Sequence, residues 1–370
     1  MCFTSASGMS TNRITYSSIM KKFSLFLSLL LSFVLTGVYA QSLGDFKPND
    51  DSFKPGKIDK GTKEMYIANF VINFEVYKEA IDKKREGGFG RTVKNASKAK
   101  AAVGLSTLDK ESLQATADKL YADFVAEMKD KGYSLISAEE AGKTAYYEGW
   151  KKVTGPSIFE IGLPGILAVV PSGYSYYYKE QNAVSNKLAG FAKGSQDLSQ
   201  ELNDAVVADI SLVYAFTEVS KGWNIEEAAK VKIDVNYRLA HIYHFSNEKT
   251  EEARGRITKY LDTSKQEATL SSYANFTRGK LKIGGSPESQ YAGSLKSCLE
   301  INDVLKKEKI VAYSKQTRAT ATIQNPVVII RGDNYSETTK WLEPDGIKYS
   351  EGMYNAGSKF LSYHTAEVFE

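Results

Sequence analysis

The sequence predicts an α/β protein, with α+β as the alternative, in which helices flank a mixed, largely antiparallel sheet in a layered domain. Three segments carry this prediction. Residues 107–132 repeat apolar side chains at spacings of three and four, which is typical of a helix with one buried face. Residues 65–77 and 228–243 alternate apolar and polar side chains instead, which is typical of strands. A helix, a glycine and a short apolar strand in succession indicate an α/β layer.

The helix predicted over residues 107–132 has recognisable ends. Thr107 or Asp109 can cap its first amides, and Gly132 can adopt the left-handed conformation that ends many helices. Residues 133–136 then read as a short strand. The helix positions expected to face the core are Leu113, Ala117, Leu120, Phe124 and Met128.

Three strands are predicted from alternation. In residues 65–77, Phe70, Ile72 and Phe74 share one face, while Asn73 and Glu75 share the other. Residues 205–219 are apolar enough for a central strand. Together with residues 228–243 they predict an antiparallel hairpin, turning at 221–224, with one solvated face. The side chains expected on that face are Lys232, Asp234, Asn236 and Arg238.

The other segments give weaker patterns. Residues 78–100 are Lys-rich and read as a polar insertion, and the glycines of residues 86–91 favour a flexible loop over a phosphate cradle, because the dinucleotide and P-loop fingerprints are absent. Residues 181–201, 249–269 and 286–309 are predicted helices. Residues 310–313 and 319–330 are predicted strands, and residues 341–363 read as turns followed by an amphipathic stretch.

The N-terminal 40 residues predict an extension and a secretory signal peptide. Lys21 and Lys22 precede a run of about 16 apolar residues, shorter than the roughly 20 that span a bilayer, and Val38-Tyr39-Ala40 fits a signal-peptidase site. Cleavage before Gln41 is favoured over an uncleaved anchor. Residues 41–64 then form a flexible lead-in or loose strap, and residues 65–370 the α/β region, with a sub-boundary near 245–285.

Charge excludes one class of partner. Removal of the first 40 residues would take away Arg13, Lys21 and Lys22 and no acidic residue. The 48 basic residues then fall to 45 against 44 acidic ones, which gives a net charge of +1. A nearly neutral chain lacks the basic footprint of a nucleic-acid-binding protein. Cys2 lies in the same N-terminal segment, so the processed chain would keep Cys298 as its single cysteine and could form no internal disulfide. We expect Cys298 to be a small buried residue near the end of a helix or on its core face.

No catalytic or metal signature is visible, so we assign no catalytic residue, no metal ligand and no cofactor. His241 and His244 are three apart, which on a strand places them on opposite faces and argues against a shared ion. His364, near the C-terminus, is expected at the surface or an interface. Neither a nucleophile elbow nor a zinc-protease motif occurs.

A tyrosine cluster follows an apolar stretch. Residues 158–170 are apolar but broken by glycine and proline, so they are too short and interrupted for a membrane span. One interpretation is a buried strand or loop with an aromatic turn. The other is an element that contacts a partner or a membrane through the tyrosines, which are Tyr174, Tyr176, Tyr177 and Tyr178.

Two blocks resemble the curli-secretion-channel family of bacterial envelope proteins. Residues 120–136 resemble its helix that ends at glycine and runs into a strand, and residues 208–219 with 229–239 resemble the paired strands that follow. The lipid-attachment cysteine of that family is absent after the signal. The resemblance implies a three-layer α/β envelope domain that assembles or binds partners without an active site.

We therefore expect an exported, non-enzymatic cell-envelope protein that is periplasmic, outer-membrane associated or extracellular. Its expected partners are other envelope proteins or itself, membrane contact is left open, and no small-molecule ligand is specified. One alternative is a secreted hydrolase whose active site is dispersed along the chain. The second alternative is a membrane-inserting or pore-forming protein that uses residues 158–178.

Overall fold

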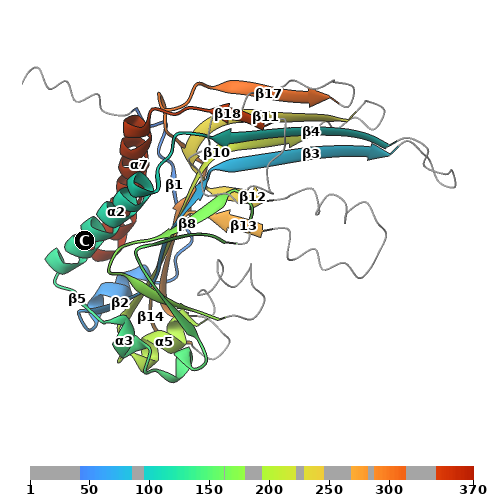
Figure 1. The fold of residues 1–370 in the computed structure, drawn as a ribbon. Coiled ribbons are helices and arrows are strands. Elements are labelled where there is room, and N and C mark those ends of the chain that lie inside the picture. Colours follow the sequence, from blue (N-terminus) through green and yellow to red (C-terminus); the bar gives the residue numbers. More distant parts are fainter. Residues whose placement is uncertain are drawn as a thin grey trace, which may run out of the picture. The chain divides into compact units, whose positions relative to one another are not determined.

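An eleven-stranded mixed β-sheet organises the part of the chain that the structure describes (Figure 1). The structure is a computed structural model, described over residues 42–85, 96–161, 163–179, 194–221, 229–245, 268–281, 287–313 and 339–370. The sheet strands are β1 (Pro48–Asp50), β2 (Glu64–Glu75), β5 (Ser134–Leu135), β7 (Ser157–Glu160), β8 (Ile166–Val170), β10 (Val206–Lys221), β11 (Lys230–Leu239), β14 (Tyr273–Leu281), β15 (Pro287–Leu295), β16 (Leu299–Glu300) and β17 (Glu308–Tyr313).

The order of these strands is β1-β15-β14-β10-β2-β8-β7, while β11 also pairs with β10, β16 and β17, and β5 pairs with β2. The β2–β10 and β2–β5 pairs are parallel, and the other pairs of this sheet are antiparallel. The chain is mostly sheet, with mixed and antiparallel sheets. The antiparallel hairpin predicted from residues 205–219 and 228–243 is confirmed as β10 and β11.

Three smaller sheets complete the strands. In the first, β4 (Ala96–Leu105) lies between the antiparallel β3 (Tyr77–Arg85) and the parallel β18 (Thr339–Leu342). The second pairs β12 (Ile242–Phe245) with β13 (Ala268–Ser271), and the third pairs β6 (Lys151–Thr154) with β9 (Ser175–Tyr178).

The prediction of a polar insertion over residues 78–100 is wrong, because most of that segment forms β3 and β4. Their charged side chains concealed the strands. Lys78 and Asp82 are buried, but Lys78 donates to the hydroxyl of Tyr243 and Asp82 accepts from the amide of Lys230, so both charges are hydrogen-bonded. The glycine-rich residues 86–91 lie outside the described residues.

The register of β2 and β10 gives the sheet centre two different faces. Phe70 lies opposite Ile210, and Phe74 opposite Tyr214, on one face. The residues at the alternate positions, such as Asn69 opposite Asp209, point to the other face because side chains alternate along a strand. The alternation predicted for β2 is confirmed, although every residue from Met65 to Glu75 is buried, so both faces are covered.

Helix α2 (Lys110–Asp130) confirms the helix predicted over residues 107–132, and all five predicted core positions are buried. Asp109 caps it by accepting from the amide of Ser112 at 2.5 Å. Gly132 has a φ of 86°, its amide bonds to the carbonyl of Lys129, and the Tyr133 amide reaches back to Met128. These two bonds form a Schellman motif, which turns the chain directly into β5.

Helix α7 (Gly346–Phe369) contacts α2 and the sheet, and it corrects the prediction for His364. His364 is fully buried rather than at the surface, because it follows Phe360 by four residues on the buried stripe of the helix. Its Nδ1 lies 2.6 Å from the hydroxyl of Tyr291, and its Nε2 lies 3.1 Å from the carbonyl of Ser294. A carbonyl only accepts, so Nε2 carries the proton and Nδ1 accepts from Tyr291.

The helix predicted over residues 286–309 is also wrong. Residues 287–295 form β15, whose buried positions alternate but include Ser289 and Gly293. Gly293 leaves room for the imidazole of His364, which a Cβ at that position would meet. Small residues at inward positions therefore concealed a period of two, and the larger Tyr291 and Leu295 gave a helical spacing of four.

The segment predicted as a flexible lead-in or loose strap carries regular structure. Leu43 bridges to Ile301, β1 pairs with β15, and Phe53 bridges to Gln290. A short helix, η1 (Pro55–Lys60), follows and buries Ile58. Arg278 of β14 then donates to the carbonyls of Ile58 and Thr62, so this segment is fastened to the sheet along its length.

The remaining described elements are short: α3 (Ala138–Ala141), η2 (Ala145–Tyr147) and α5 (Ser195–Glu201). Among the described helices, none combines the length and the apolar character needed to cross a membrane. The chain divides into residues 1–40 and 41–370, and all described elements belong to the second unit. Outside the described residues lie the predicted signal peptide, the turn at 222–224, the predicted strand 319–330, and most of the helices predicted over 181–201 and 249–269, of which only α5 and the first two residues of β13 are described.

Candidate functional site

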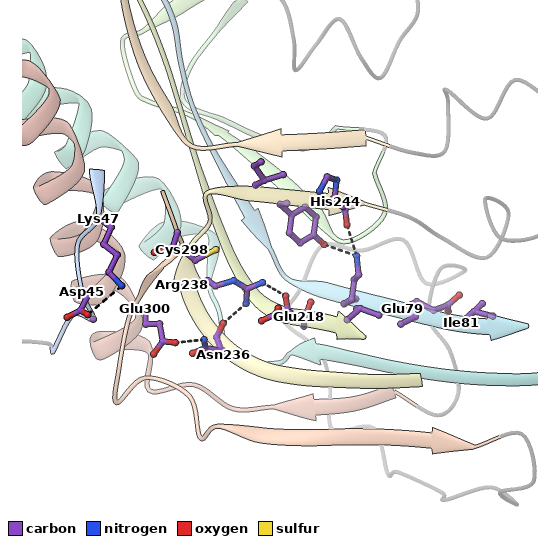
Figure 2. Close-up of a pocket in the computed structure, with 18 residues that line it drawn as sticks. Asp45, Lys47, Glu79, Ile81, Glu218, Asn236, Arg238, His244, Cys298 and Glu300 are labelled. Carbon is purple, nitrogen blue, oxygen red and sulfur yellow. Dashed lines mark hydrogen bonds and ion pairs between the residues drawn. The ribbon is translucent and has the colours of Figure 1, made fainter. Parts of the chain in front are cut away.

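A cavity of about 890 Å³ lies where β3 separates from the main sheet (Figure 2). Six segments that are distant in sequence form its wall: the strap before β1, the starts of β3 and β12, the end of β10, part of β11, and the connection from β15 into β16. Its volume falls within the range of small-molecule sites in proteins. The wall is unusually rich in charge, with Lys47, Lys78, Arg238, Asp45, Glu79, Glu218 and Glu300.

Glu75 supports this cavity from behind. It is 1% exposed, and its Oε2 accepts from the amides of Phe216 at 2.8 Å and Thr217 at 2.9 Å. Its Oε1 accepts from the hydroxyls of Thr217 and Tyr243, each at 2.6 Å. The β10–β11 register shifts between Ala215 and Thr217, which frees the amides that Glu75 binds. The carboxylate therefore fills a hydrogen-bonding gap that a bulge creates.

Lys78 and Tyr243 form the adjoining part of the wall. The Lys78 ammonium lies 3.2 Å from the Tyr243 hydroxyl and 4.8 Å from the centre of its ring, and Phe245 lies beyond at 5.4 Å. Burial, followed by the charge of Glu75, raises the pKa of Tyr243 well above its usual value. The Tyr243 hydroxyl therefore stays protonated and donates a hydrogen bond to Glu75.

Arg238 is the second buried cation of the wall, with 7% of its surface exposed. Its Nη1 donates to the carbonyl of Asn236 at 2.8 Å and its Nη2 to the carbonyl of Thr217 at 2.6 Å. The prediction that Arg238 lies on the solvated face of β11 is wrong. Two residues of β11, Asn236 and Tyr237, lie opposite Phe216 at the bulge, which ends the simple alternation before Arg238.

The acidic side chains at the rim differ in their partners. Glu79 pairs with Lys100 at 2.8 Å, and Asp45 lies 3.7 Å from Lys47. Glu300 accepts from Lys307 at 2.7 Å and from the amide of Asn236 at 3.1 Å, and these two hydrogen bonds lower the pKa of its carboxyl group. Glu218 is exposed and forms no ion pair with another described residue.

The histidines and the cysteine do not assemble into a reactive group. His244 lines the cavity, and its Nδ1 lies 3.2 Å from the hydroxyl of Thr269. Cys298 lines it as well, half-buried in the connection between β15 and β16, so the helical placement predicted for it is wrong. Figure 2 shows His244 and Cys298 on different elements of the wall, β12 and the connection before β16. Within the described ranges, no group of His, Cys, Asp and Glu could hold a metal ion.

Comparisons with known proteins give no family. No protein-family model, no curated protein and no solved structure matches this chain. The cavity is lined by two buried cations, Lys78 and Arg238, and by the carboxylates of Asp45, Glu79, Glu218 and Glu300. Such a mixture of charges is suited to binding a polar ligand by charge complementarity.

The predicted contact tyrosines are not together at this cavity. Tyr174 and Tyr176 are each 3% exposed and belong to the core, where the Tyr174 hydroxyl donates to the carbonyl of Ile67. Tyr177 is half-buried, stacks on Tyr147 at 4.4 Å and donates to the carbonyl of Ala138. Tyr178 is half-buried on β9. A contact role for Tyr177 and Tyr178 stays a prediction, and burial leaves Tyr174 and Tyr176 no surface for one.

The apolar segment before these tyrosines is likewise part of the sheet. Strands β7 and β8 form a hairpin, and β8 pairs with β2. Ile166 to Val170 are all buried. Among the two interpretations of residues 158–170, this arrangement corresponds to the buried strand.

A second polar group lies on the face of β2 and β10 that carries Glu75. Asp209 is 3% exposed, and Asn69 donates to it at 3.0 Å. Burial raises the pKa of Asp209 to about 6, against the hydrogen bonds from Asn69 and Tyr273 that favour its charged form. Asp209 does not line the cavity beside β3, and its side chain is buried within the fold.

Sequence reasoning missed Glu75, Lys78 and Arg238 as site residues. The available signal was a charged residue next to large apolar ones, as in the runs around Glu75 and Arg238. A strand with one solvated face produces the same local pattern, so the sequence alone could not separate a buried charge from an exposed one.

Proposed function

We propose that the chain is an exported, non-enzymatic cell-envelope protein that binds a partner or takes part in an envelope assembly. The signal-peptide pattern before Gln41 supports export. The resemblance of residues 120–136, 208–219 and 229–239 to envelope proteins that assemble supports the choice of compartment and role. The residues at the cavity support binding over catalysis.

The observation that carries the proposal is the use of Glu75. A general base needs a lone pair that can reach a substrate proton. Both oxygens of Glu75 accept two hydrogen bonds each from groups of the fold, and its side chain is 1% exposed. The most deeply buried carboxylate beside the cavity is therefore occupied with holding strand β10, and the cavity is left with groups that bind rather than react.

A layered arrangement is part of the proposal. The ring centres of Phe70 and Phe124 of α2 are 5.8 Å apart, and those of Phe276 of β14 and Phe369 of α7 are 5.0 Å apart. These contacts support helices packed on one face of the main sheet. Such a layer would leave the strand ends and the cavity available to a partner.

Fractionation with mass spectrometry tests export and processing together. We expect the chain in the periplasmic, outer-membrane or extracellular fraction, with Gln41 as its first residue. Recovery of an unprocessed chain from the cytosol would contradict the proposal. A variant with Ala40→Leu should accumulate unprocessed, since the last position before a signal-peptidase site requires a small side chain.

Light scattering after size exclusion, with cross-linking in intact cells, tests the binding role. We expect either an oligomer or a reproducible envelope partner. Charge reversal at the rim, Glu218→Lys, should weaken the association if the cavity takes part, while Glu139→Lys on α3 serves as a control for exposed charge. A monomer with no cross-linked partner would oppose the proposal.

A secreted hydrolase is the second candidate, favoured by one observation: His244, Cys298 and Glu218 line the same cavity. Esterase, peptidase and glycosidase substrates, tested with the His244→Ala and Cys298→Ser variants, decide it. Turnover that both variants abolish would establish the hydrolase and remove the binding proposal. Turnover that neither variant changes would indicate a contaminating enzyme.

A further inference from the structure

We propose that the cavity beside β3 binds a short peptide as a zwitterion, with the peptide carboxylate on Arg238 and its ammonium group on Glu218. This inference rests on the proposed binding function and names the ligand class. It requires an anion site, a cation site and room for the ligand between them.

Arg238 provides the anion site. A buried charge is normally compensated by an opposite charge or by strong hydrogen bonds, because removing it from water is costly. Arg238 is 7% exposed, yet its two recorded hydrogen bonds go to neutral carbonyls, and no carboxylate of the described residues forms an ion pair with it. A guanidinium has five donors in a planar fork that matches a carboxylate. Arg238 is thus held in place by two bonds, with donors remaining for a ligand.

The neighbouring charge favours a carboxylate. Lys78 is 5% exposed and lines the same cavity, so its ammonium adds positive potential near Arg238. Glu75 lies behind the wall and accepts four hydrogen bonds from neutral donors. A ligand carboxylate in the cavity would compensate the buried charge of Arg238, in a setting where charge interactions exceed those in bulk water.

Glu218 provides the cation site. The other acidic residues of the wall, Asp45, Glu79 and Glu300, each lie within ion-pair distance of a lysine. Glu218 has no such partner among the described residues and is exposed at the rim. Glu218 and Arg238 line the same cavity (Figure 2). A dianion such as phosphate would be repelled there, whereas a ligand with an ammonium group would be attracted.

The cavity volume admits a ligand larger than an ion. About 890 Å³ is near the upper end of small-molecule sites, so a single carboxylate would leave it mostly empty. A short peptide carries both charges and also has polar backbone and small apolar side chains, which suits a wall that mixes charged and apolar residues.

Calorimetry with three matched tripeptides tests the proposal on the full chain. Trialanine carries both charges, trialaninamide lacks the carboxylate, and N-acetyl-trialanine lacks the ammonium. We expect trialanine to bind at least tenfold more tightly than either derivative. No binding of trialanine at concentrations on the order of 1 mM, or equal affinity for the three peptides, would overturn the proposal.

Two variants assign each charge to its residue. Arg238→Lys should reduce the preference for trialanine over trialaninamide several-fold, because a point charge cannot replace the planar fork. Glu218→Gln should bind trialanine and N-acetyl-trialanine equally, and the control Glu139→Gln should retain both preferences. If Arg238→Lys only lowers the melting temperature and leaves the preference for the carboxylate intact, Arg238 is a clamp for the strand bulge and the proposal fails.

The two proposals can fail independently. Glu218 is exposed, so Glu218→Gln should fold even if Arg238→Lys does not, and unchanged discrimination against N-acetyl-trialanine in that variant is sufficient to reject the site. Loss of peptide binding would leave export and assembly standing. Finding the chain unprocessed in the cytosol would remove the envelope role while leaving any measured peptide affinity in place.

Discussion

The two faces of the β2–β10 pair are both buried, but they are stabilised in different ways. On one face Phe70, Phe74 and Tyr214 pack with aromatic neighbours, and Phe74 stacks on Tyr214 at 5.4 Å. On the other face Asn69, Glu75 and Asp209 replace packing with hydrogen bonds. Apolar contacts tolerate small changes of shape, whereas a buried polar group is costly as soon as one partner is lost. The two faces should therefore respond differently to conservative substitutions.

Glu75→Gln should give the largest contrast. Gln keeps the shape but presents an NH₂ group toward donors, so about two charge-assisted hydrogen bonds are lost and the free energy of unfolding should fall by about 4 kcal/mol. Phe74→Leu, its neighbour on the apolar face, should cost only about 1.5 kcal/mol. Urea unfolding of both variants measures this. Equal losses would show that the polar face is no more demanding than the apolar one.

His364, which lies on α7 against the main sheet, should make the free energy of unfolding rise with pH. Burial lowers its pKa to about 4 in the folded chain, so between pH 4 and about 6.5 the unfolded chain binds more protons. This group therefore contributes about 3 kcal/mol above pH 6.5 that is lost as the pH falls toward 4. His364→Gln should remove this dependence, which denaturation at several pH values would reveal. A variant with the slope of the native chain would contradict the burial of a neutral imidazole.

Asp209, on the polar face, should make the free energy of unfolding fall as the pH rises, which is opposite to the effect of His364. Its folded pKa is about 6, above the unfolded value near 3.9, so the folded chain binds more protons between these limits. Its contribution is present below about pH 4 and is lost as the pH rises through 6, by about 3 kcal/mol. Asp209→Asn should therefore become more stable, relative to the native chain, at pH 7.5 than at pH 4. The double variant with His364→Gln should show neither slope.

The smallest effect is expected at Asn73, on the same polar face. Its Oδ1 is buried and has no hydrogen-bond partner among the described residues, and its Nδ2 bonds are long, at 3.4 Å to Ser211 and 3.5 Å to Leu212. Asn73→Leu should change the free energy of unfolding by less than about 1 kcal/mol, because little hydrogen bonding is lost and an unpaired acceptor is removed. Thermal unfolding measures it. A loss as large as that of Glu75→Gln would mean that Asn73 belongs to the same network.

Sequence reasoning succeeded where one physical rule decided the structure. The stripe from Leu113 to Met128 and the left-handed Gly132 fixed α2, and the alternation from Val231 to Leu239 fixed β11. It failed where a neighbour changed the rule. The imidazole of His364 occupies the space that a side chain at Gly293 would need, so this inward position of β15 is a glycine. The alternation of apolar residues along β15 is therefore not visible in the sequence.

The candidate site was beyond the sequence for a similar reason. Its wall is formed by separate segments that lie between positions 44 and 300 of the sequence. The role of Arg238 depends on a strand bulge that no local sequence pattern predicts. The tyrosine cluster was conspicuous because its members are adjacent in the chain. Adjacency in the chain did not give them a shared surface, since Tyr174 and Tyr176 are buried.

The fastening of the N-terminal strap has a kinetic consequence. Leu43 bridges to Ile301, and Gly44 bonds to the carbonyl of Glu300, so the first described residues meet a segment made some 250 positions later. Closing such a long loop is entropically costly and depends on strands that must already be in place. Gly44 and Asp45 are also part of the cavity wall. In the proposed export, the wall of the cavity could therefore be completed only after the chain up to about residue 300 has crossed the membrane.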